Sequence, residues 1–304
     1  MVTRAAPVPE RALVRRPPHP RFAGTVRGEI LKLTRQRSTW VMLGIGVLLF
    51  LIVVAAMVSA PDSRDQLRQD PRAFFYLVLN VFLSVFDAGA GIFLLIVTAR
   101  LTAMEYSSGT IRVLLARGLG RVTLLGAKLV TLTAAGTVLF AVFVAATTAA
   151  VYAFVVSSAG TFHPIAALPG TAWHNLELNL LIGLISVVVN ILLATAVAVL
   201  GRSLAFGLGA ALAFFPADNF GTIVLLLLER LTHQHFFAEI SAYMLGPNLN
   251  VLQRVLETDH RAGVAFASPL VPVTATHALL VIAAWAVAFL ALAISLTWRR
   301  DILE

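Results

Sequence analysis

The stretch RLTAMEYSSGTIRVLLARGLGRVTLLGAK, residues Arg100–Lys128, lies between two long apolar runs and decides how the chain is organised. It carries five basic residues against a single acid, Glu105. A basic segment between two membrane spans is retained on the cytoplasmic side. Within it, Ile111–Leu115 mixes apolar residues with an arginine, which favours a short amphipathic helix. The sequence therefore predicts a multi-span membrane protein with a docking element in this loop.

The composition agrees with a membrane protein. Hydrophobic residues make up 59% of the 304 residues and charged residues only 12%, and the mean hydropathy is +0.89. A soluble domain is about half apolar and about a quarter charged. The chain contains no cysteine, which excludes disulfides and thiolate metal sites. The hydrocarbon of a bilayer is therefore the main solvent of this protein.

Six segments are long and apolar enough to cross about 30 Å of hydrocarbon, which takes about 20 helical residues. They lie near residues 39–60, 74–99, 124–156, 178–200, 204–228 and 273–298, and none holds Lys or Arg well inside it. These segments predict an all-α polytopic membrane protein with six transmembrane helices in one domain, residues 39–300.

The distribution of basic residues predicts the orientation. With the N-terminus inside, the inner segments hold 17 Lys and Arg and the outer segments hold six. Such an imbalance places both termini in the cytoplasm of a multi-pass protein, and we expect it in the plasma membrane. The net charge of +8 then reflects topology, so a nucleic acid partner is not expected.

The segment before the first span falls into two parts. Residues 1–21 are rich in proline and arginine, which is typical of a disordered cytoplasmic tail, and they lack the apolar core of a cleaved signal. Residues 22–38 have an apolar face made by Phe22, Val26, Ile30 and Leu33, with Arg27, Lys32 and Arg35 elsewhere on the wheel. This pattern predicts an amphipathic interfacial helix in contact with membrane lipid; a frayed linker is the alternative.

The last outer segment, residues 229–272, is the longest. Phe236–Leu245 and Leu249–Leu256 have helical apolar spacing and are separated by the turn signal Gly246-Pro247-Asn248. The nearby residues Glu229, His233, His235 and Glu239 form two i, i+4 pairs on different helical faces. Zinc needs ligands that converge on one point, so these pairs favour a solvated turn over a metal site.

Two acids lie at mid-membrane depth, Asp87 in the second span and Asp218 in the fifth. An ionised carboxylate there costs about 2.5–3.5 kcal/mol, so each acid is neutral, hydrogen-bonded or faces a wet cavity. One interpretation is that they line a translocation pathway or bind a proton. The other is that they stabilise helix packing, with Asn190 of the fourth span as a possible partner.

Pro216 in the fifth span should kink it, because proline removes the hydrogen bond to the carbonyl of Leu212. Just before it, Ala205, Gly209 and Ala213 form a stripe of small residues at four-residue spacing. Such a stripe lets helices approach closely. It fits either a contact between two copies of the chain or packing within one copy.

The chain lacks the motifs that bind nucleotides. A phosphate-binding loop needs Gly-x-x-x-x-Gly-Lys-Ser/Thr, whereas Gly120 to Lys128 has the wrong spacing and is followed by Leu129. The Gly118-Leu119-Gly120 triplet lacks the third glycine of a dinucleotide fingerprint. We therefore expect no catalytic, cofactor-binding or metal-binding residues in this chain.

The opening loop resembles that of the permease subunits of ABC transporters of the type-2 export class. The residues that carry the resemblance are Glu105, Gly109, Thr110, Leu114, Leu115, Arg121 and Lys128. Glu29-Ile30-Leu31-Lys32-Leu33, ahead of the first span, is similar to the opening of that family. Gly118 and Gly120 occupy the region where members commonly have a proline before the arginine.

The resemblance implies a coupling helix at Glu105–Arg117, including Arg112 and Arg117, that sits in a groove of a separate ABC ATPase. It implies two permeases, here expected to be a homodimer, and two ATPases, with ATP and magnesium bound only on the ATPases. The expected cargo is a small amphipathic molecule such as a drug, lipid or peptide. A proton-coupled transporter using Asp87 and Asp218, an intramembrane enzyme and a membrane scaffold are the alternatives.

Overall fold

The computed structural model describes residues 21–116, 118–256 and 267–299. Helices account for 88% of the described residues, which contain no strand. The predicted all-α class is therefore confirmed. Residues 1–20, which include most of the predicted tail, lie outside the described ranges.

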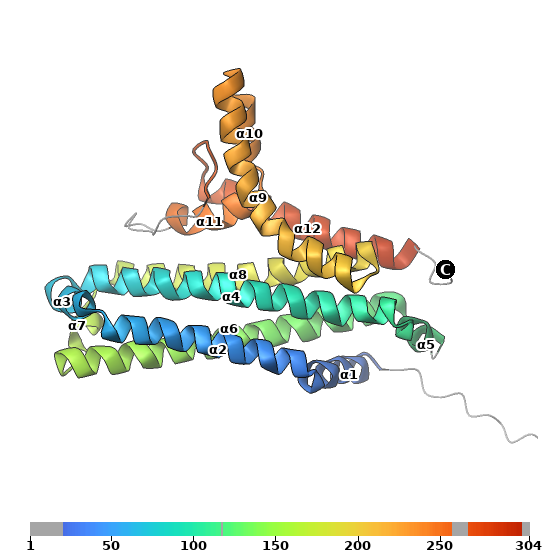
Figure 1. Ribbon diagram of the computed structural model, residues 1–304, viewed down its shortest axis with the longest axis horizontal. Helices are drawn as coiled ribbons and strands as arrows, with labels where there is room; N and C mark the ends of the chain where they lie inside the picture. The colour runs from blue at the N-terminus through green and yellow to red at the C-terminus, as the bar shows by residue number, and fades with distance from the viewer. Residues whose placement is uncertain (1–20, 117, 257–266, 300–304) are drawn as a thin grey trace, which may run out of the picture.

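Long helices that run side by side form the body of the molecule (Figure 1). Its centre is built from α4 (Pro71–Ser107), α6 (Arg121–Ala159) and α8 (Gly170–Gly201), flanked by α2 (Arg37–Ser59) and α12 (Ala275–Arg299). The most extensive interface joins α4 and α8. Short helices close the two ends: α1 (Phe22–Arg35) and α5 (Thr110–Ala116) at one, α3 (Pro61–Gln69) and α7 (His163–Ala166) at the other.

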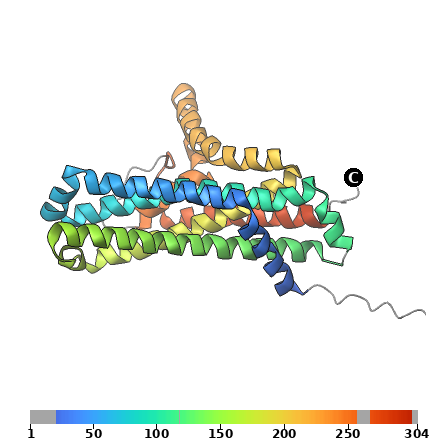
Figure 2. The same ribbon diagram turned by 60° about the horizontal axis from the view of Figure 1, so that its bottom comes forward.

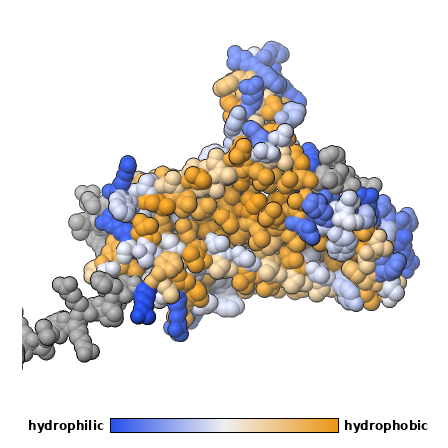
Figure 3. All heavy atoms as spheres, turned by 180° about the vertical axis from the view of Figure 1, so that it is seen from behind, coloured by the Kyte–Doolittle hydropathy of each residue, from blue (hydrophilic) through white to orange (hydrophobic). Residues whose placement is uncertain are grey.

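Five described helices are long and apolar enough to cross a membrane, and a bent pair supplies a sixth span if it is counted as one. On the face drawn in Figure 3, hydrophobic residues cover the middle of the bundle and hydrophilic residues gather towards both ends. The chain is therefore a multi-pass membrane protein. The α4 helix has 37 residues and α6 has 39, about 55–60 Å each, so both extend beyond the hydrocarbon.

The bent pair is α9 (Leu204–Thr232), whose parts Leu204–Phe214 and Pro216–Thr232 meet at 44°. The bend lies at Pro216, as the sequence predicts. The first part packs on α4 and α8, whereas the second part projects sideways from the bundle together with α10 (Phe236–Ser241) (Figure 2). We refer to Pro216–Thr232 and α10 as the α9–α10 arm.

The turn in the last outer segment lies earlier than predicted. It falls between α10 and α11 (Leu245–Leu256), at Ala242–Met244, and Gly246-Pro247-Asn248 belong to the first turn of α11. Proline is tolerated there because the first amides of a helix have no intrahelical acceptor. Two side chains fix this start: Asp218 accepts a hydrogen bond from the Gly246 amide, and Asn248 Nδ2 donates to the carbonyl oxygen of Met244 at 2.7 Å.

The α6 and α8 helices approach closely where each offers a glycine. A Cβ at Gly136 of α6 would lie 2.7 Å from Val187 Cγ1, and a Cβ at Gly183 of α8 would lie 2.7 Å from the Phe140 ring. The two contacts are reciprocal, since each glycine receives a large side chain of the facing helix. Small residues at such crossings allow van der Waals packing between membrane helices.

We expect Asp70→Ala to lower the free energy of unfolding by about 1 kcal/mol. Asp70 caps α4, because its Oδ1 accepts a hydrogen bond from the Ala73 amide at 2.9 Å and Pro71 follows as the first helical residue. Thermal unfolding of the purified chain in detergent measures the change. Asp65→Ala, an exposed position inside α3, is the matched control and should change stability by less than about 0.5 kcal/mol. Equal losses for both variants would contradict the capping role.

Candidate functional site

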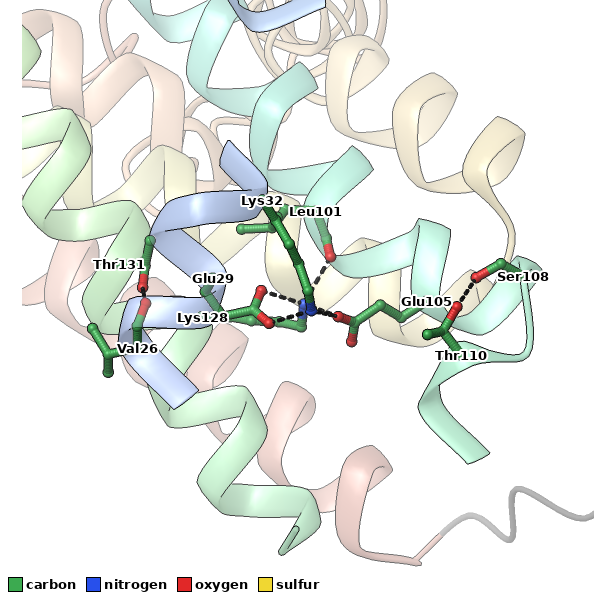
Figure 4. Close-up of polar contacts among 9 residues, drawn as sticks. All are labelled: Val26, Glu29, Lys32, Leu101, Glu105, Ser108, Thr110, Lys128 and Thr131. Carbon is green, nitrogen blue, oxygen red and sulfur yellow. Dashed lines mark hydrogen bonds and ion pairs between the residues drawn. The ribbon is translucent and has the colours of Figure 1, made fainter. Parts of the chain in front are cut away.

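Two acids and two lysines from three helices form one ionic network at the end of the bundle that holds α1 and α5 (Figure 4). Lys128 Nζ of α6 lies 2.9 Å from Glu29 Oε2 of α1 and 3.0 Å from Glu105 Oε1 of α4. Lys32 Nζ of α1 lies 2.5 Å from Glu29 Oε1 and 2.5 Å from Glu105 Oε1. Each lysine thus bridges both carboxylates, and the network links α1, α4 and α6.

Three of the four charged side chains are buried. Glu29 is 2% exposed, Lys128 3% and Glu105 7%, whereas the side chain of Lys32 is 41% exposed. Lys128 Nζ also donates to the carbonyl oxygen of Leu101 at 2.8 Å, so its ammonium has three partners. Buried charges persist only when they are paired and hydrogen-bonded. The network therefore fixes where α1 lies on the bundle.

Local sequence explains why these residues meet. Glu29 falls on the same face of α1 as Val26 and Leu33, and this face packs on α6. Leu33 is part of a buried cluster with Leu101 and Leu132. Thr131 Oγ1 donates to the carbonyl oxygen of Val26 at 3.5 Å, one turn from Glu29. The apolar face of α1 thus carries its acid into the bundle.

Lys32 keeps its charge at neutral pH. Burial alone would lower the pKa of its ammonium, but hydrogen bonds to Glu105 and Glu29, together with their charges, raise the pKa above its ordinary value of 10.5. The raised pKa means that the contribution of Lys32 to stability is present throughout the physiological range and is lost only above about pH 10.

A small cavity of about 20 Å³ lies beside the network. Its lining includes Thr102 and Glu105 of α4, Arg121 and Lys128 of α6, and Thr297 of α12. The second carboxylate oxygen of Glu105 and the hydroxyl of Thr102 are buried and have no hydrogen-bond partner among the described residues. A volume of this size holds about one water molecule, and these two polar atoms can bind it.

The short helix α5 follows α4 after a tight turn. Ser108 Oγ and Thr110 Oγ1 are 2.5 Å apart across this turn, and Gly109 has φ +69°, a conformation that favours glycine. The inner face of α5 carries Ile111, Leu114 and Leu115, which pack with Leu119 and Leu124 at the start of α6. Val113, on the opposite face, is 52% exposed. The helix therefore presents a small apolar surface away from the bundle.

Comparison with known proteins places the chain in a family. The family model for ABC-2 family transporter proteins matches residues 25–217, more than half of the chain. The chain belongs to the ABC-2 transporter family. The match runs from α1 to the bend of α9, so it includes all four residues of the ionic network. A search of curated proteins gave no match.

Membership makes this chain a permease, the membrane component of an ABC transporter, and the family implies association with an ABC ATPase. The ABC-2 family is one of transport subunits that typically lack a nucleotide-binding site. The resemblance noted in the sequence is thereby confirmed at the level of the family.

The structure divides the range predicted as the coupling helix of this ABC-2 permease. Glu105 belongs to the last turns of α4, and only Thr110–Ala116 form the separate helix. Leu114 and Leu115 face the bundle, and Arg121 Nη1 donates to the carbonyl oxygen of Trp298 in α12 at 3.4 Å. Arg117 and the side chain of Arg112 lie outside the described structure.

The residues of the predicted interfacial helix separate into two groups. Val26, Glu29 and Leu33 face the bundle, whereas Phe22 and Ile30 are exposed together with Leu31, which the sequence pattern did not place on the apolar face. Lys32 lies between the two groups. The ABC-2 permease therefore uses α1 as a packed helix with one exposed face.

The predicted pathway residues lie apart from the ionic network. Asp87 is exposed, midway along α4, whereas Asn190 is buried and its Nδ2 donates to the Ser186 carbonyl oxygen at 2.8 Å. Asn190 is next to Gly91 of α4, and Asp218 caps α11 close to the bend at Pro216. The Asn190 amide therefore donates to a backbone carbonyl of its own helix and not to either acid, and Asp218 binds the Gly246 amide instead.

In the predicted Glu and His cluster, His235 Nδ1 lies 3.1 Å from Glu229 Oε1. The described residues contain no group of three or more His, Cys, Asp or Glu that could hold a metal ion.

The ionic network itself was missed from the sequence. Glu29, Lys32, Glu105 and Lys128 were each noted separately, but their contact was not predicted. A signal was available: Glu29 lies next to Leu33 on the side of the wheel that also holds Val26, and Lys128 lies between Leu124 and Leu132, so both charges fall on apolar faces. Charges in such positions need a buried partner.

Proposed function

We propose that this ABC-2 permease is the membrane subunit of an ATP-driven exporter and that α5 is the helix that docks on the ATPase. The observation that carries the proposal is the exposed face around Val113 of α5, the helix that follows Glu105 of the buried ionic network along the chain. A docking helix must present an apolar contact and must also be attached firmly to the spans. The geometry supports both requirements.

The ionic network provides the attachment. Because Glu105 lies two residues before Ser107, the last residue of α4, a displacement of α5 is transmitted to a carboxylate that holds α1 and α6. Bridged, buried ion pairs resist separation, since breaking one leaves an uncompensated charge. ATP-driven movement at α5 is therefore expected to reach three helices together.

The proposed complex contains two permeases and two ATPases, with ATP and magnesium held by the ATPases. The second permease is proposed to be a copy of this chain. In support, Ala205, Gly209 and Ala213 lie on the exposed side of α9, and Gly209 has no atom within 4 Å of an added Cβ. Such a stripe can receive a second helix. Both termini are proposed to lie in the cytoplasm of a cell whose plasma membrane holds the protein.

The pull-down of an ATPase from native membranes tests the docking face. The tagged full chain is solubilised in mild detergent as wild type and as Val113→Asp. We expect one ABC ATPase with the wild type and at least a tenfold lower yield with the variant, because a charge in the apolar contact must be desolvated. Val113 is preferable to Leu114, since Leu114 packs inside the permease.

Ala166→Asp, an exposed alanine of α7 at the opposite end of the bundle, is the matched control and should retain the ATPase. Equal ATPase recovery from Val113→Asp would show that α5 is not the docking face. If wild type captures no ATPase, the exporter assignment fails. Transport driven by a proton gradient without ATP would then favour the secondary transporter.

A further inference from the structure

One face of α4 contains an uncovered stretch in the middle of the membrane. The face is formed by a stripe with helical spacing of three and four, namely Leu77, Val81, Ser84, Ala88, Ile92, Leu95, Ala99 and Ala103. The last three residues are buried, whereas the first five are exposed. We call Ser84–Ile92, the part of this exposed stretch that lies midway along α4, the α4 window.

Other elements border the window on both sides. Towards the α3 and α7 end, Gln253 Nε2 of α11 donates to Asn80 Oδ1 at 2.7 Å. Towards the α1 and α5 end, the first part of α9 covers α4, and an added Cβ at Gly207 would lie 3.6 Å from Ala103 Cβ. The 44° bend at Pro216 then directs α9 away from the bundle (Figure 1). The window lies along α4 between these two contacts.

An uncompensated carboxylate lies in the window. Asp87 is exposed, and among the described residues it has neither a hydrogen-bond partner nor an ion-pair partner. It differs in this from Asp218, which accepts a hydrogen bond from the Gly246 amide. A lone carboxylate at mid-membrane depth costs about 2.5–3.5 kcal/mol when hydrocarbon surrounds it. Asp87 is therefore either protonated or paired with a positive charge from outside the chain.

The spans of this chain offer no Lys or Arg side chain that could pair with Asp87 at this depth. None of the six spans holds Lys or Arg well inside it. The histidine His277 lies in the first turn of α12, where its Nε2 is 2.9 Å from the Ala242 carbonyl oxygen. A second copy of this chain has the same spans, so a homodimer brings no Lys or Arg to this depth either. A positive charge that pairs with ionised Asp87 would therefore come from a molecule that is not this protein.

We propose that the α4 window binds an amphipathic organic cation, which is the substrate of the transporter. Asp87 neutralises the positive charge of that molecule, and the Ser84 hydroxyl accepts a hydrogen bond from it where it carries an N–H group. The apolar body of the cation lies against Val81, Ala88 and Ile92, which are apolar or small. This inference rests on the proposed function, and it specifies the charge of the cargo.

Equilibrium binding to the purified full chain tests the window without the ATPase. The probes are tetraphenylphosphonium and tetraphenylborate, which have nearly the same shape and opposite charges. Wild type is expected to bind the phosphonium at least tenfold more tightly than the borate. Asp87→Asn should weaken phosphonium binding at least tenfold, whereas Asp87→Glu should retain most of it. A tenfold change corresponds to about 1.4 kcal/mol.

Asp218→Asn is the matched control, since it removes the other membrane acid from a site that already has a partner, and it should leave phosphonium binding unchanged. Ser84→Leu keeps the Asp87 carboxylate but fills the window with a larger side chain, so it should also weaken phosphonium binding. If purified Asp87→Asn is not monodisperse, Ser84→Leu tests the proposal in its place. Equal binding of both probes, or wild-type affinity in Asp87→Asn, overturns the proposal. The proposal is also overturned if wild type binds neither probe, as it would if a second copy of the chain covered the window. None of these results affects the ATPase pull-down, so the two proposals fail separately.

Discussion

Lys128→Met is expected to lower the free energy of unfolding of this permease by about 3–5 kcal/mol, the cost of removing one partner from a buried ion pair. The variant leaves Glu29 and Glu105 buried with only the half-exposed Lys32 between them. It also removes the donor to the Leu101 carbonyl oxygen. Unfolding of the purified chain in mixed micelles of a mild and a denaturing detergent measures the loss.

Lys32→Met is the matched control for that measurement. Its side chain is 41% exposed, so solvent screens its ion pairs and the expected loss is only about 1 kcal/mol. Adding Glu29→Gln to Lys128→Met removes an excess negative charge and should recover part of the stability. A Lys128 variant as stable as the Lys32 variant would show that the network does not hold α1 on the bundle.

Gly183→Ala is expected to cost about 1–3 kcal/mol, because the new methyl group overlaps the Phe140 ring where α6 crosses α8. A Cβ there would lie 2.7 Å from Phe140 Cε2 and 2.8 Å from Cζ. Combining Gly183→Ala with Phe140→Leu removes the overlapping atoms, so the two changes should be strongly non-additive. The same micelle unfolding experiment reads out both variants.

Gly209→Ala provides the comparison, since nothing lies within 4 Å of its added Cβ. Alanine is the better helix former, so this change should be neutral or stabilising by up to about 1 kcal/mol. If Gly183→Ala behaves like Gly209→Ala, the close approach of α6 and α8 is not as tight as the structure describes. If Gly209→Ala alone destabilises the assembled transporter, a second chain occupies the α9 stripe.

The helical spans were predictable because hydrophobicity alone determines them. Each predicted segment lies within a described helix or differs from its bounds by a few residues at most. Residues 39–60, for example, correspond to α2, Arg37–Ser59. The ends were less predictable. The α4 helix continues to Ser107, past Arg100 and Glu105, because its polar last turns are stabilised by α1 and α6 rather than by lipid.

The short helix α5 was predictable in kind but not in orientation. Ile111, Leu114 and Leu115 indicated an amphipathic helix, yet the same residues cannot pack on the bundle and also face a partner. The structure resolves this, because Leu119 and Leu124 cover the inner face and leave Val113 outside. Which face of α5 packs on the bundle depends on the position of the first residues of α6, and the apolar periodicity of α5 alone carries no information about that position.

The bend of α9 was predictable from Pro216, but the direction of the α9–α10 arm was not. Proline removes one hydrogen bond and permits a kink. The direction is set by tertiary contacts, including the one from Asp218 to the Gly246 amide of α11, 28 residues later in the chain. The role of Asp218 as a helix cap likewise depends on this contact between α9 and α11.

The separation of Glu29 and Lys128 along the chain has a consequence for biosynthesis. These residues are 99 positions apart, so a ribosome that adds about 5–20 residues per second takes about 5–20 s to make the second after the first. During that interval Glu29 has only Lys32 of its own helix to pair with, and we expect this charged face to keep α1 at the aqueous boundary of the membrane. The α1 helix therefore reaches its final place only when α6 has been made, and a nascent chain that stops before Lys128 leaves this end of the molecule open.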